Sequence, residues 1–331
     1  MLLFLLLACP AADDPDPGGV VDDSAPPEDT DTQDTDTDTD PDTDTDTGFD
    51  PLGLAAEVSE AELRATITDL AALGTRFTYS DGDEAAADYL VERFAELGLV
   101  ATRDAFDVEG TRCENLIVEV PGTVTPERVY VFSAHYDSTS NRPDSDAPGA
   151  DDNASGVAAV LETARIFAEH RLESTAWFVL TAAEEQGSLG SLHLVETMQD
   201  QVIDARGVIA PDMIGYWPLG EGDAMDILGD DASAPLVQQM SEVADSLGVA
   251  NKVWVEHDYC QGDDHTNFQD AGFPAISPMD CVEAHNVRGS GEETPHYHSH
   301  TDTVDTLHLG FTTRVVGVLT ATFATWVGVG E

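Results

Sequence analysis

The chain has 331 residues, with 65 Asp and Glu but only 13 Lys and Arg, which gives a formal net charge of −52. Sixteen of the acidic residues and none of the basic ones lie in the first fifty positions, and the other acids are spread over the rest of the chain. This balance excludes nucleic acid as a natural partner, because a phosphate backbone is bound by a basic surface.

The first nine residues are interpreted as an export signal. Residues 2–8 are wholly apolar but too few to span a bilayer. The segment Leu6-Leu7-Ala8-Cys9 resembles the lipobox of bacterial lipoproteins, in which the cysteine takes the lipid. An ordinary cleaved signal peptide is the alternative. Both kinds of signal usually carry a basic stretch before the apolar run, and this chain has none there. We therefore expect an exported protein, either an outer-membrane or cell-surface lipoprotein held to the membrane only through Cys9, or a secreted one.

Residues 10–52 are predicted to be a disordered linker. They consist mainly of Asp, Thr, Pro and Gly, with the run DTDTQDTDTDTDPDTDTDT at their centre. Charges this dense repel one another, and too few apolar side chains are present to compensate the entropy of ordering. A calcium loop would need glycine turns that the run lacks, so an extended tether is the better interpretation.

Residues 53–331 are expected to form one domain. Helical spacing of apolar residues ends at Gly74 and again at Gly98, and the Pro121-Gly122 pair predicts a hairpin-like break between two strands. From Ser155 onwards strands and helices alternate, which predicts an α/β fold whose mixed, mostly parallel central sheet has helices on both faces. The expected helices span 59–73, 80–97, 156–169, 189–198, 234–247, 266–271 and 311–327, and the expected strands span 101–108, 115–120, 129–134, 175–181, 207–214, 253–256 and 274–277.

Four cysteines limit the possible disulfides. If Cys9 carries lipid, at most one intrachain disulfide forms among Cys113, Cys260 and Cys281. In an exported protein Cys260 and Cys281 are the plausible pair, and free buried thiols are the alternative.

The first residues that suggest chemistry end the strand-like run VYVFSAH. His135 is followed two positions later by Asp137, and residues two apart on a strand point to the same face. A metal-binding imidazole commonly donates its second N–H to a carboxylate, which Asp137 is placed to accept. A lone histidine at a strand end would more often be structural, but the aspartate makes a metal ligand the better interpretation.

Further carboxylates follow other strand ends and turns. Asp151 and Asp152 precede small residues at a helix entrance, where a helix N-cap is the simpler interpretation. Glu184 and Glu185 follow the buried run WFVLTAA, and two adjacent acids there are costly unless cations meet them. They point in opposite directions, so one can bind a metal while the other takes a proton. Asp212 follows another apolar run.

A last cluster, His298-Ser299-His300-Thr301-Asp302-Thr303, lies near the C-terminus. Most surface histidines are merely solvated, and His300 is interpreted so. The motifs H-x-D, D-x-x-S-G, E-E-x-G-x-x-G-S, D-M and H-S-x-x-D-T thus occur in order over roughly residues 55–331. Each is weak alone, but the ordered set resembles the co-catalytic di-zinc aminopeptidases, the secreted bacterial leucine aminopeptidases related to glutaminyl cyclases and glutamate carboxypeptidases.

This resemblance implies a zinc-exopeptidase-like fold that holds two Zn²⁺ ions per chain. One zinc would be held by His135 and Asp212 and the other by Glu185 and His298, with Asp152 bridging both ions. The Ser-Gly pair that follows selects Asp152 rather than the preceding aspartate as the bridge. The Asp-Thr pair near the C-terminus likewise selects His298 rather than the next histidine.

Catalytic roles are implied by the same resemblance. Glu184 would be the general base, and Asp137 would support the imidazole of His135. The peptide bond between Asp152 and Asn153 would be cis, as it is in relatives. Ala210 and Pro211 stand where relatives often carry Asn, a departure that affects none of these roles.

The leading hypothesis is an exported, monomeric aminopeptidase that removes N-terminal residues from peptides. Glutaminyl cyclases replace the Ser-Gly after the bridging aspartate and lack the Gly-Ser of the Glu-Glu motif, and both are intact here. A carboxypeptidase would need a basic cluster, for which only Arg142, Arg206 and Arg288 are candidates. A metal-free binding module would have lost ligands that are present here. The substrate pocket is expected to involve the loops 216–222 and 258–268.

Overall fold

The computed structural model describes residues 50–216, 224–255, 262–279 and 294–330. Cys9, Cys260 and Cys281 lie outside these residues, as do the predicted signal, most of the linker and parts of both predicted pocket loops. Cys113 is a buried free thiol. The first described helix, the 3-10 helix η1 (Pro51–Glu57), begins just before the predicted domain boundary.

An eight-stranded sheet forms the centre of the domain. Its strands are β1 (Ala101–Val108), β2 (Thr111–Val120), β3 (Thr125–His135), β5 (Ser174–Thr181), β6 (Asp204–Ile209), β7 (Met225–Gly229), β8 (Asn251–Val255) and β9 (Ala275–Met279). They are ordered β1-β2-β5-β3-β6-β9-β7-β8. Strands β5, β3, β6 and β9 run parallel to one another, and antiparallel pairs occur towards both ends. A separate antiparallel pair joins β4 (Arg171–Leu172) to β10 (Val329–Gly330).

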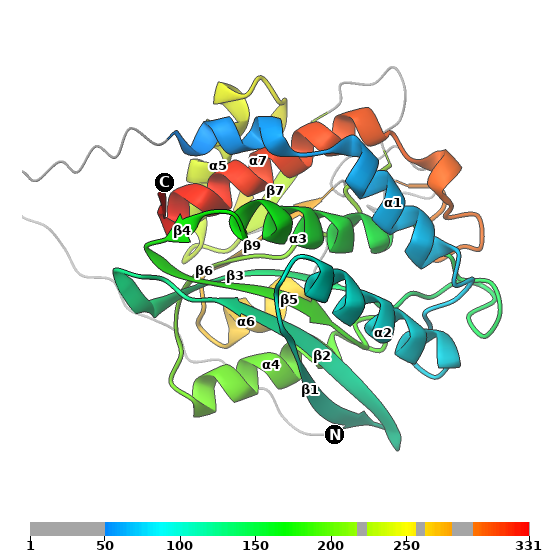
Figure 1. Cartoon of the computed structure of the whole chain (residues 1–331). Helices are drawn as coiled ribbons and strands as arrows, with labels where there is room; N and C mark the ends of the chain where they lie inside the picture. The colour runs from blue at the N-terminus through cyan, green and yellow to red at the C-terminus, as the bar shows by residue number, and fades with distance from the viewer. Residues whose placement is uncertain (1–49, 217–223, 256–261, 280–293, 331) are drawn as a thin grey trace, which may run out of the picture. The chain divides into compact units, whose positions relative to one another are not determined.

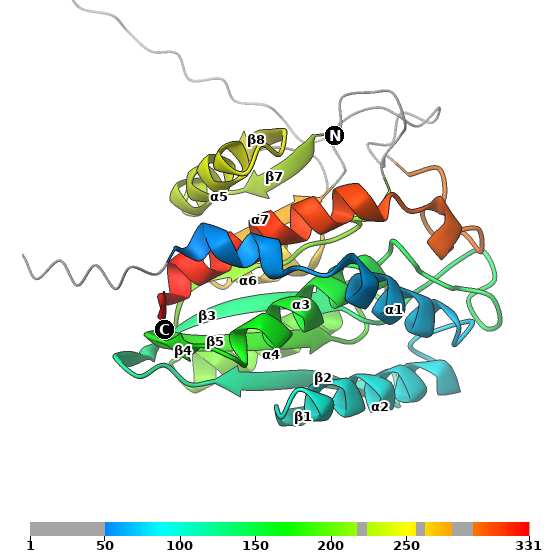
Figure 2. The same cartoon turned by 45° about the horizontal axis from the view of Figure 1, so that its top comes forward.

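Helices cover both faces of the sheet, as Figures 1 and 2 show. The larger apolar cluster packs α1 (Glu60–Ala71), α2 (Asp81–Glu96), α3 (Ala154–Phe167), α5 (Ala234–Ser246) and α7 (Leu309–Val327) on one face, with η2 (Val304–Thr306) against it. The smaller cluster packs α4 (Leu189–Asp200) and α6 (Asp264–Asp270) on the other. No helix among the described residues has the length and apolar character needed to cross a membrane.

Strand β5 shows why the two layers could be predicted. Phe178 and Leu180 pack into the larger cluster, whereas Trp177 and Val179 pack into the smaller one. Successive side chains of a strand point to opposite faces, so a strand covered on both faces is apolar at every position. The continuous apolar run AWFVL within β5 therefore indicates a central strand, and the predicted α/β architecture is confirmed.

The prediction that the strands on either side of Pro121-Gly122 pair as a hairpin is wrong. β5 lies between β2 and β3, antiparallel to β2 and parallel to β3. The hairpin of this region is formed instead by β1 and β2. A turn dipeptide indicates where the chain bends, but not which strands pair. The strand between β2 and β3 is β5, which begins only at Ser174.

Other strands also differ from the prediction, and β6 and β7 differ most near the site. β6 ends at Ile209 rather than at residue 214, because Pro211 has no N–H to donate to a strand ladder. Asp212 is left in an isolated bridge with Met279. β7 was not predicted because its short apolar run is interrupted by Asp226, whose carboxylate accepts a hydrogen bond from Trp254 Nε1 at 2.8 Å.

A buried carboxyl group in α2 makes stability depend on pH. Asp83 is 6% exposed, and its Oδ1 has no hydrogen-bond partner among the described residues. Burial, followed by the charge of Asp137, raises the pKa of Asp83 from 3.8 to about 8. Because the unfolded chain releases this proton first as the pH rises, the stability contributed by the protonated carboxyl is lost between about pH 4 and pH 8.

Asp83→Asn should therefore stabilise the protein more at pH 8 than at pH 5, by up to about 4 kcal/mol at roughly 1.4 kcal/mol per pH unit. Urea unfolding of wild type and variant at both pH values measures this difference. Asp81→Asn is the matched control, because Asp81 lies in the same helical turn but is exposed. An equal effect of Asp83→Asn at the two pH values would contradict the assignment.

Candidate active site

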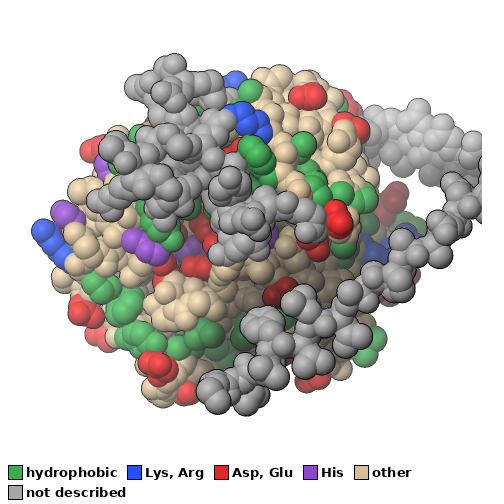
Figure 3. All heavy atoms as spheres, turned by 180° about the vertical axis from the view of Figure 1, so that it is seen from behind, with side chains coloured by type: hydrophobic (Ala, Val, Ile, Leu, Met, Phe, Trp, Pro, Cys, Tyr) green, Lys and Arg blue, Asp and Glu red, His purple; other side chains and the backbone are tan. Residues whose placement is uncertain are grey.

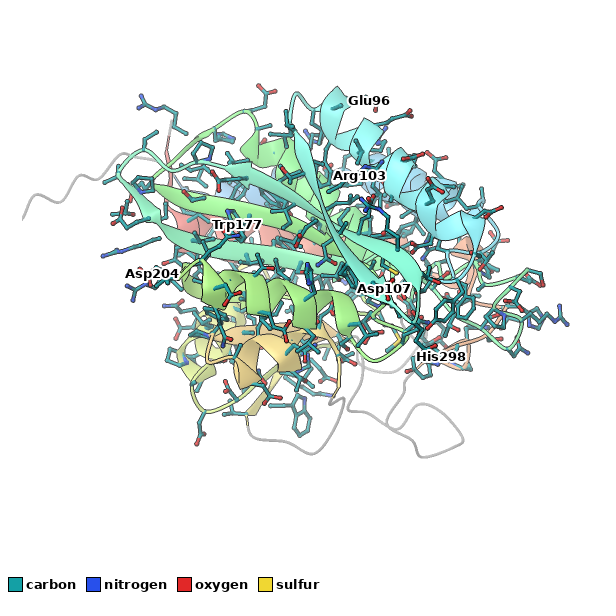
Figure 4. All side chains as sticks on the ribbon, turned by 90° about the horizontal axis from the view of Figure 1, so that it is seen from below. Glu96, Arg103, Asp107, Trp177, Asp204 and His298 are labelled. Atoms are coloured by element: carbon teal, nitrogen blue, oxygen red, sulfur yellow. The ribbon has the colours of Figure 1, made fainter. Side chains whose placement is uncertain are left out.

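The five predicted metal ligands meet at the carboxyl ends of the parallel strands. His135 ends β3, Glu185 lies in the turn after β5, and Asp212 follows β6. Figure 4 shows Asp204, at the start of β6, and His298 at opposite ends of the sheet. This is the edge at which open α/β sheets bind their ligands.

The first group of side chains surrounds His135. Its Nε2 lies 3.3 Å from Asp152 Oδ1 and 3.5 Å from Asp212 Oδ1. All three residues are buried. Neither ring nitrogen of His135, nor Asp212 Oδ1, has a hydrogen-bond partner in the described part of the chain.

The second group surrounds His298, whose Nε2 lies 2.9 Å from Glu185 Oε2 and 3.4 Å from Asp152 Oδ2. The other oxygen of Glu185 accepts the N–H of Thr139 at 3.0 Å. His298 is partly exposed and stacks on Tyr297, and Figure 3 shows histidines beside acidic side chains on one face of the molecule. Asp152 therefore turns one carboxylate oxygen to each group.

Asp152 is held in place through its backbone. Its N–H donates to Asp302 Oδ2 at 3.1 Å, and the N–H of Asp151 donates to Asp302 Oδ1 at 2.9 Å. The peptide bond from Asp152 to Asn153 is cis, as the resemblance implied. The sequence marked Asp302 only as part of a motif, and the structure shows the contact through which it orients the shared carboxylate.

Asp151 has different partners from Asp152. Its Oδ1 accepts the N–H of Gly215 at 2.7 Å, and its carbonyl oxygen accepts a hydrogen bond from Ser155 Oγ. Burial raises the pKa of Asp151 well above its ordinary value, and Asp302 adds to the shift. The carboxylate of Asp151 thus faces the backbone of Gly215, whereas that of Asp152 faces both imidazoles.

Asp137 links two segments that carry site residues. Its Oδ1 lies 3.5 Å from His135 Nδ1. The same carboxylate accepts the backbone N–H groups of Glu184 at 3.0 Å and Glu185 at 3.2 Å. Asp137 therefore faces the imidazole as predicted, and it also fixes the turn that carries the two glutamates.

Glu184 stands beside these groups in a different environment. Its Oε1 accepts a hydrogen bond from Ser188 Oγ at 2.9 Å. Burial raises the pKa of Glu184 well above its ordinary value; His135 opposes this shift, whereas Asp264 and Glu185 add to it. A carboxylate with a raised pKa is suited to accept a proton and later release it.

The model of peptidase family M28 matches residues 115–323 of the chain. The chain belongs to this family. A probable zinc metalloprotease of Pyrenophora teres f. teres (strain 0-1) is 30% identical over 322 residues, which cover 80% of this chain and 66% of that protein. The chain thus spans about two thirds of the length of the curated relatives that it matches first.

Solved structures share the fold of this M28 chain. The LapA aminopeptidase of Legionella pneumophila superposes with a TM-score of 0.70 at 20% identity, over 85% of this chain and 75% of that one. A glutaminyl cyclase of Fimbriiglobus ruber superposes with a TM-score of 0.66 at 18% identity, over 80% of this chain and 95% of that one. The predicted family and fold are therefore confirmed.

The donor set of this M28 site fits divalent metal ions. Ligand atoms of His135, Asp152 and Glu185 all lie within 4.8 Å of one another. Burial alone would lower the pKa of His135, but Asp212 and its other carboxylate neighbours raise it well above the ordinary value. So many buried carboxylates are costly without compensating cations, and mixed imidazole and carboxylate donors suit zinc.

Of the arginines considered for a substrate carboxylate, the two in the described part of the chain are each paired with an aspartate. Arg206 pairs with Asp204, at the far end of β6 from the site, and Arg142 is an exposed partner of Asp146. Arg288 lies outside the described residues. The structure instead reveals a cation that the sequence analysis missed, Arg76, which is fully buried next to the ligands.

Proposed function

We propose that the protein is an exported zinc-dependent aminopeptidase that removes N-terminal residues from peptides with the help of two zinc ions. The observation that carries the proposal is Asp152, which turns one oxygen towards His135 and the other towards His298. A carboxylate shared between two groups of ligands is the arrangement that a two-metal hydrolase requires. The zinc metalloprotease and aminopeptidase names of similar proteins support the proposal.

Zinc bound at these residues would supply a Lewis acid and lower the pKa of a water molecule. Glu184 then accepts a proton from the attacking water and returns it to the amine that leaves. The Ser188 hydroxyl orients the carboxylate of Glu184, and Asp137 fixes its backbone. Both the side chain and the backbone of Glu184 are therefore fixed by hydrogen bonds.

Export and the monomeric state are part of the proposal. Export rests on the sequence, in which Cys9 stands at a lipobox-like position before a long acidic linker. Peptides outside the cytoplasm would then be the substrates. Fractionation of cells that express wild type or Cys9→Ala separates a lipid-anchored enzyme from a freely secreted one, and recovery in the cytoplasm would contradict export.

Amino-acid anilides with a free amino group should be hydrolysed, and the same anilides with an acetylated amino group should not. Treatment with a zinc chelator should abolish the activity, and added Zn²⁺ should restore it. Elemental analysis of the purified protein gives the metal content directly. Release of C-terminal residues would contradict the proposal and indicate a carboxypeptidase. Cyclisation of N-terminal glutamine without hydrolysis would indicate a glutaminyl cyclase. A protein without any divalent metal would be a binding module.

A further inference from the structure

Arg76 is the largest fully buried side chain in the described part of the chain, with 0% exposure. The hydrogen bonds of its guanidinium group go to backbone carbonyl oxygens rather than to a carboxylate. Nε donates to Tyr136 O at 2.6 Å, Nη1 to Pro148 O at 2.6 Å, and Nη2 to Gly149 O at 2.9 Å. A planar guanidinium with its donors fixed in a fork can hold three such acceptors at defined positions.

The three acceptors belong to two of the segments that carry the first group of ligands, those of His135 and Asp152. Tyr136 lies between His135 and Asp137 at the end of β3, and Gly149 lies three residues before Asp152. One side chain therefore joins the strand end that presents the imidazole to the loop that presents the shared carboxylate.

The backbone of Arg76 reinforces the same connection. Its N–H donates to Ser138 Oγ at 3.1 Å, and its carbonyl oxygen accepts the N–H of Ser138 at 3.2 Å. Ser138 Oγ in turn donates to Ala147 O at 2.8 Å. At Gly149 the backbone has φ +51, and a Cβ there would lie 2.8 Å from Arg76 Nη2. The guanidinium group of Arg76 is therefore packed directly against the backbone at Gly149.

Arg76 also places a positive charge near the ligand carboxylates. Burial lowers its pKa, whereas Asp302, Asp137 and Asp152 oppose that shift. An arginine in a protein remains charged, so its field reduces the repulsion among the acids. It cannot bind the carboxylate of a substrate, because it is sealed from solvent.

We infer that Arg76 is a positioning residue of the metal site, which holds the end of β3 and the loop 148–152 at the separation that His135 and Asp152 need to bind the same ion. The inference rests on the proposed function and deepens it. It predicts that Arg76 acts on zinc affinity through the ligand-bearing backbone, without touching metal or substrate.

The test measures zinc binding to the full chain after removal of metal by a chelator. Two variants are compared with wild type: Arg76→Lys keeps the charge but loses the fork, and Arg76→Met also loses the charge. Arg142→Lys and Arg142→Met are the matched controls, because Arg142 lies in the neighbouring loop and its exposed side chain is hydrogen-bonded to Asp146. Zinc affinity comes from competition with a fluorescent chelator, and circular dichroism and thermal unfolding report on the metal-free fold.

Both Arg76 variants should bind zinc about 10–100-fold more weakly, the range found when groups that orient metal ligands are removed, while the Arg142 variants bind like wild type. The visible spectrum of cobalt-substituted Arg76→Lys should also differ from that of wild type, since it reports on ligand geometry. If Arg76→Met does not fold, Arg76→Lys decides. Wild-type zinc affinity and cobalt spectrum in a folded Arg76→Lys would overturn the inference, whereas absence of zinc binding by wild type would overturn the proposed function instead.

Discussion

Glu184→Gln should keep the zinc content of wild type and lower kcat by about 10³-fold, within the range that general acid–base groups contribute. The amide has nearly the same shape and can still accept the hydrogen bond from Ser188 Oγ. It cannot take a proton from water, so only the proton transfer is removed. Elemental analysis and the hydrolysis rate of an amino-acid anilide, both on the same preparation, measure the two effects.

Glu196→Gln is the matched control for this experiment. Glu196 is an exposed residue of α4, the helix that begins immediately after the turn carrying Glu184. The control should retain wild-type kcat, because its carboxylate lies in solvent. A Glu184→Gln variant that turns over at the wild-type rate would show that another group is the base. A variant that loses zinc would show that Glu184 is a ligand.

Much of the candidate site could be predicted because its residues occur at strand ends and in short motifs. The pair His135 and Asp137 follows from the two-residue period of a strand. The adjacent acids Glu184 and Glu185 follow a run apolar enough to be central in the sheet. The choice between Asp151 and Asp152 needed the family resemblance, since spacing alone leaves both at the helix entrance.

Contacts between distant segments could not be predicted. Arg76 lies sixty residues before Tyr136 in the sequence, and no local pattern separates a buried arginine from an exposed one. The carboxylate of Asp302 contacts backbone N–H groups about 150 residues away, through a fold that brings the C-terminal loop to the entrance of α3. The insertion of β5 between β2 and β3 is of the same kind, because strand order depends on packing of the whole sheet.

Asp152→Asn should remove both zinc ions of the proposed site and with them most of the hydrolytic activity, a larger effect on metal content than that of any other ligand. Asp152 Oδ1 lies 3.3 Å from His135 Nε2, and Oδ2 lies 3.4 Å from His298 Nε2. Replacing one oxygen by an amide nitrogen removes a ligand atom, because an amide N–H₂ group is a donor. It also removes the negative charge that the two ions of the proposed site would share. His135→Ala, by comparison, should weaken chiefly the ion that it shares with Asp212.

Asp151→Asn provides the matched control, since it makes the same change one residue earlier in an equally buried position. The carboxylate of Asp151 faces the backbone rather than the two imidazoles, and an amide oxygen can still accept the N–H of Gly215. Zinc content should therefore stay at the wild-type level in Asp151→Asn. If this variant loses zinc while Asp152→Asn keeps it, the shared carboxylate belongs to Asp151, and the two aspartates exchange their assigned roles.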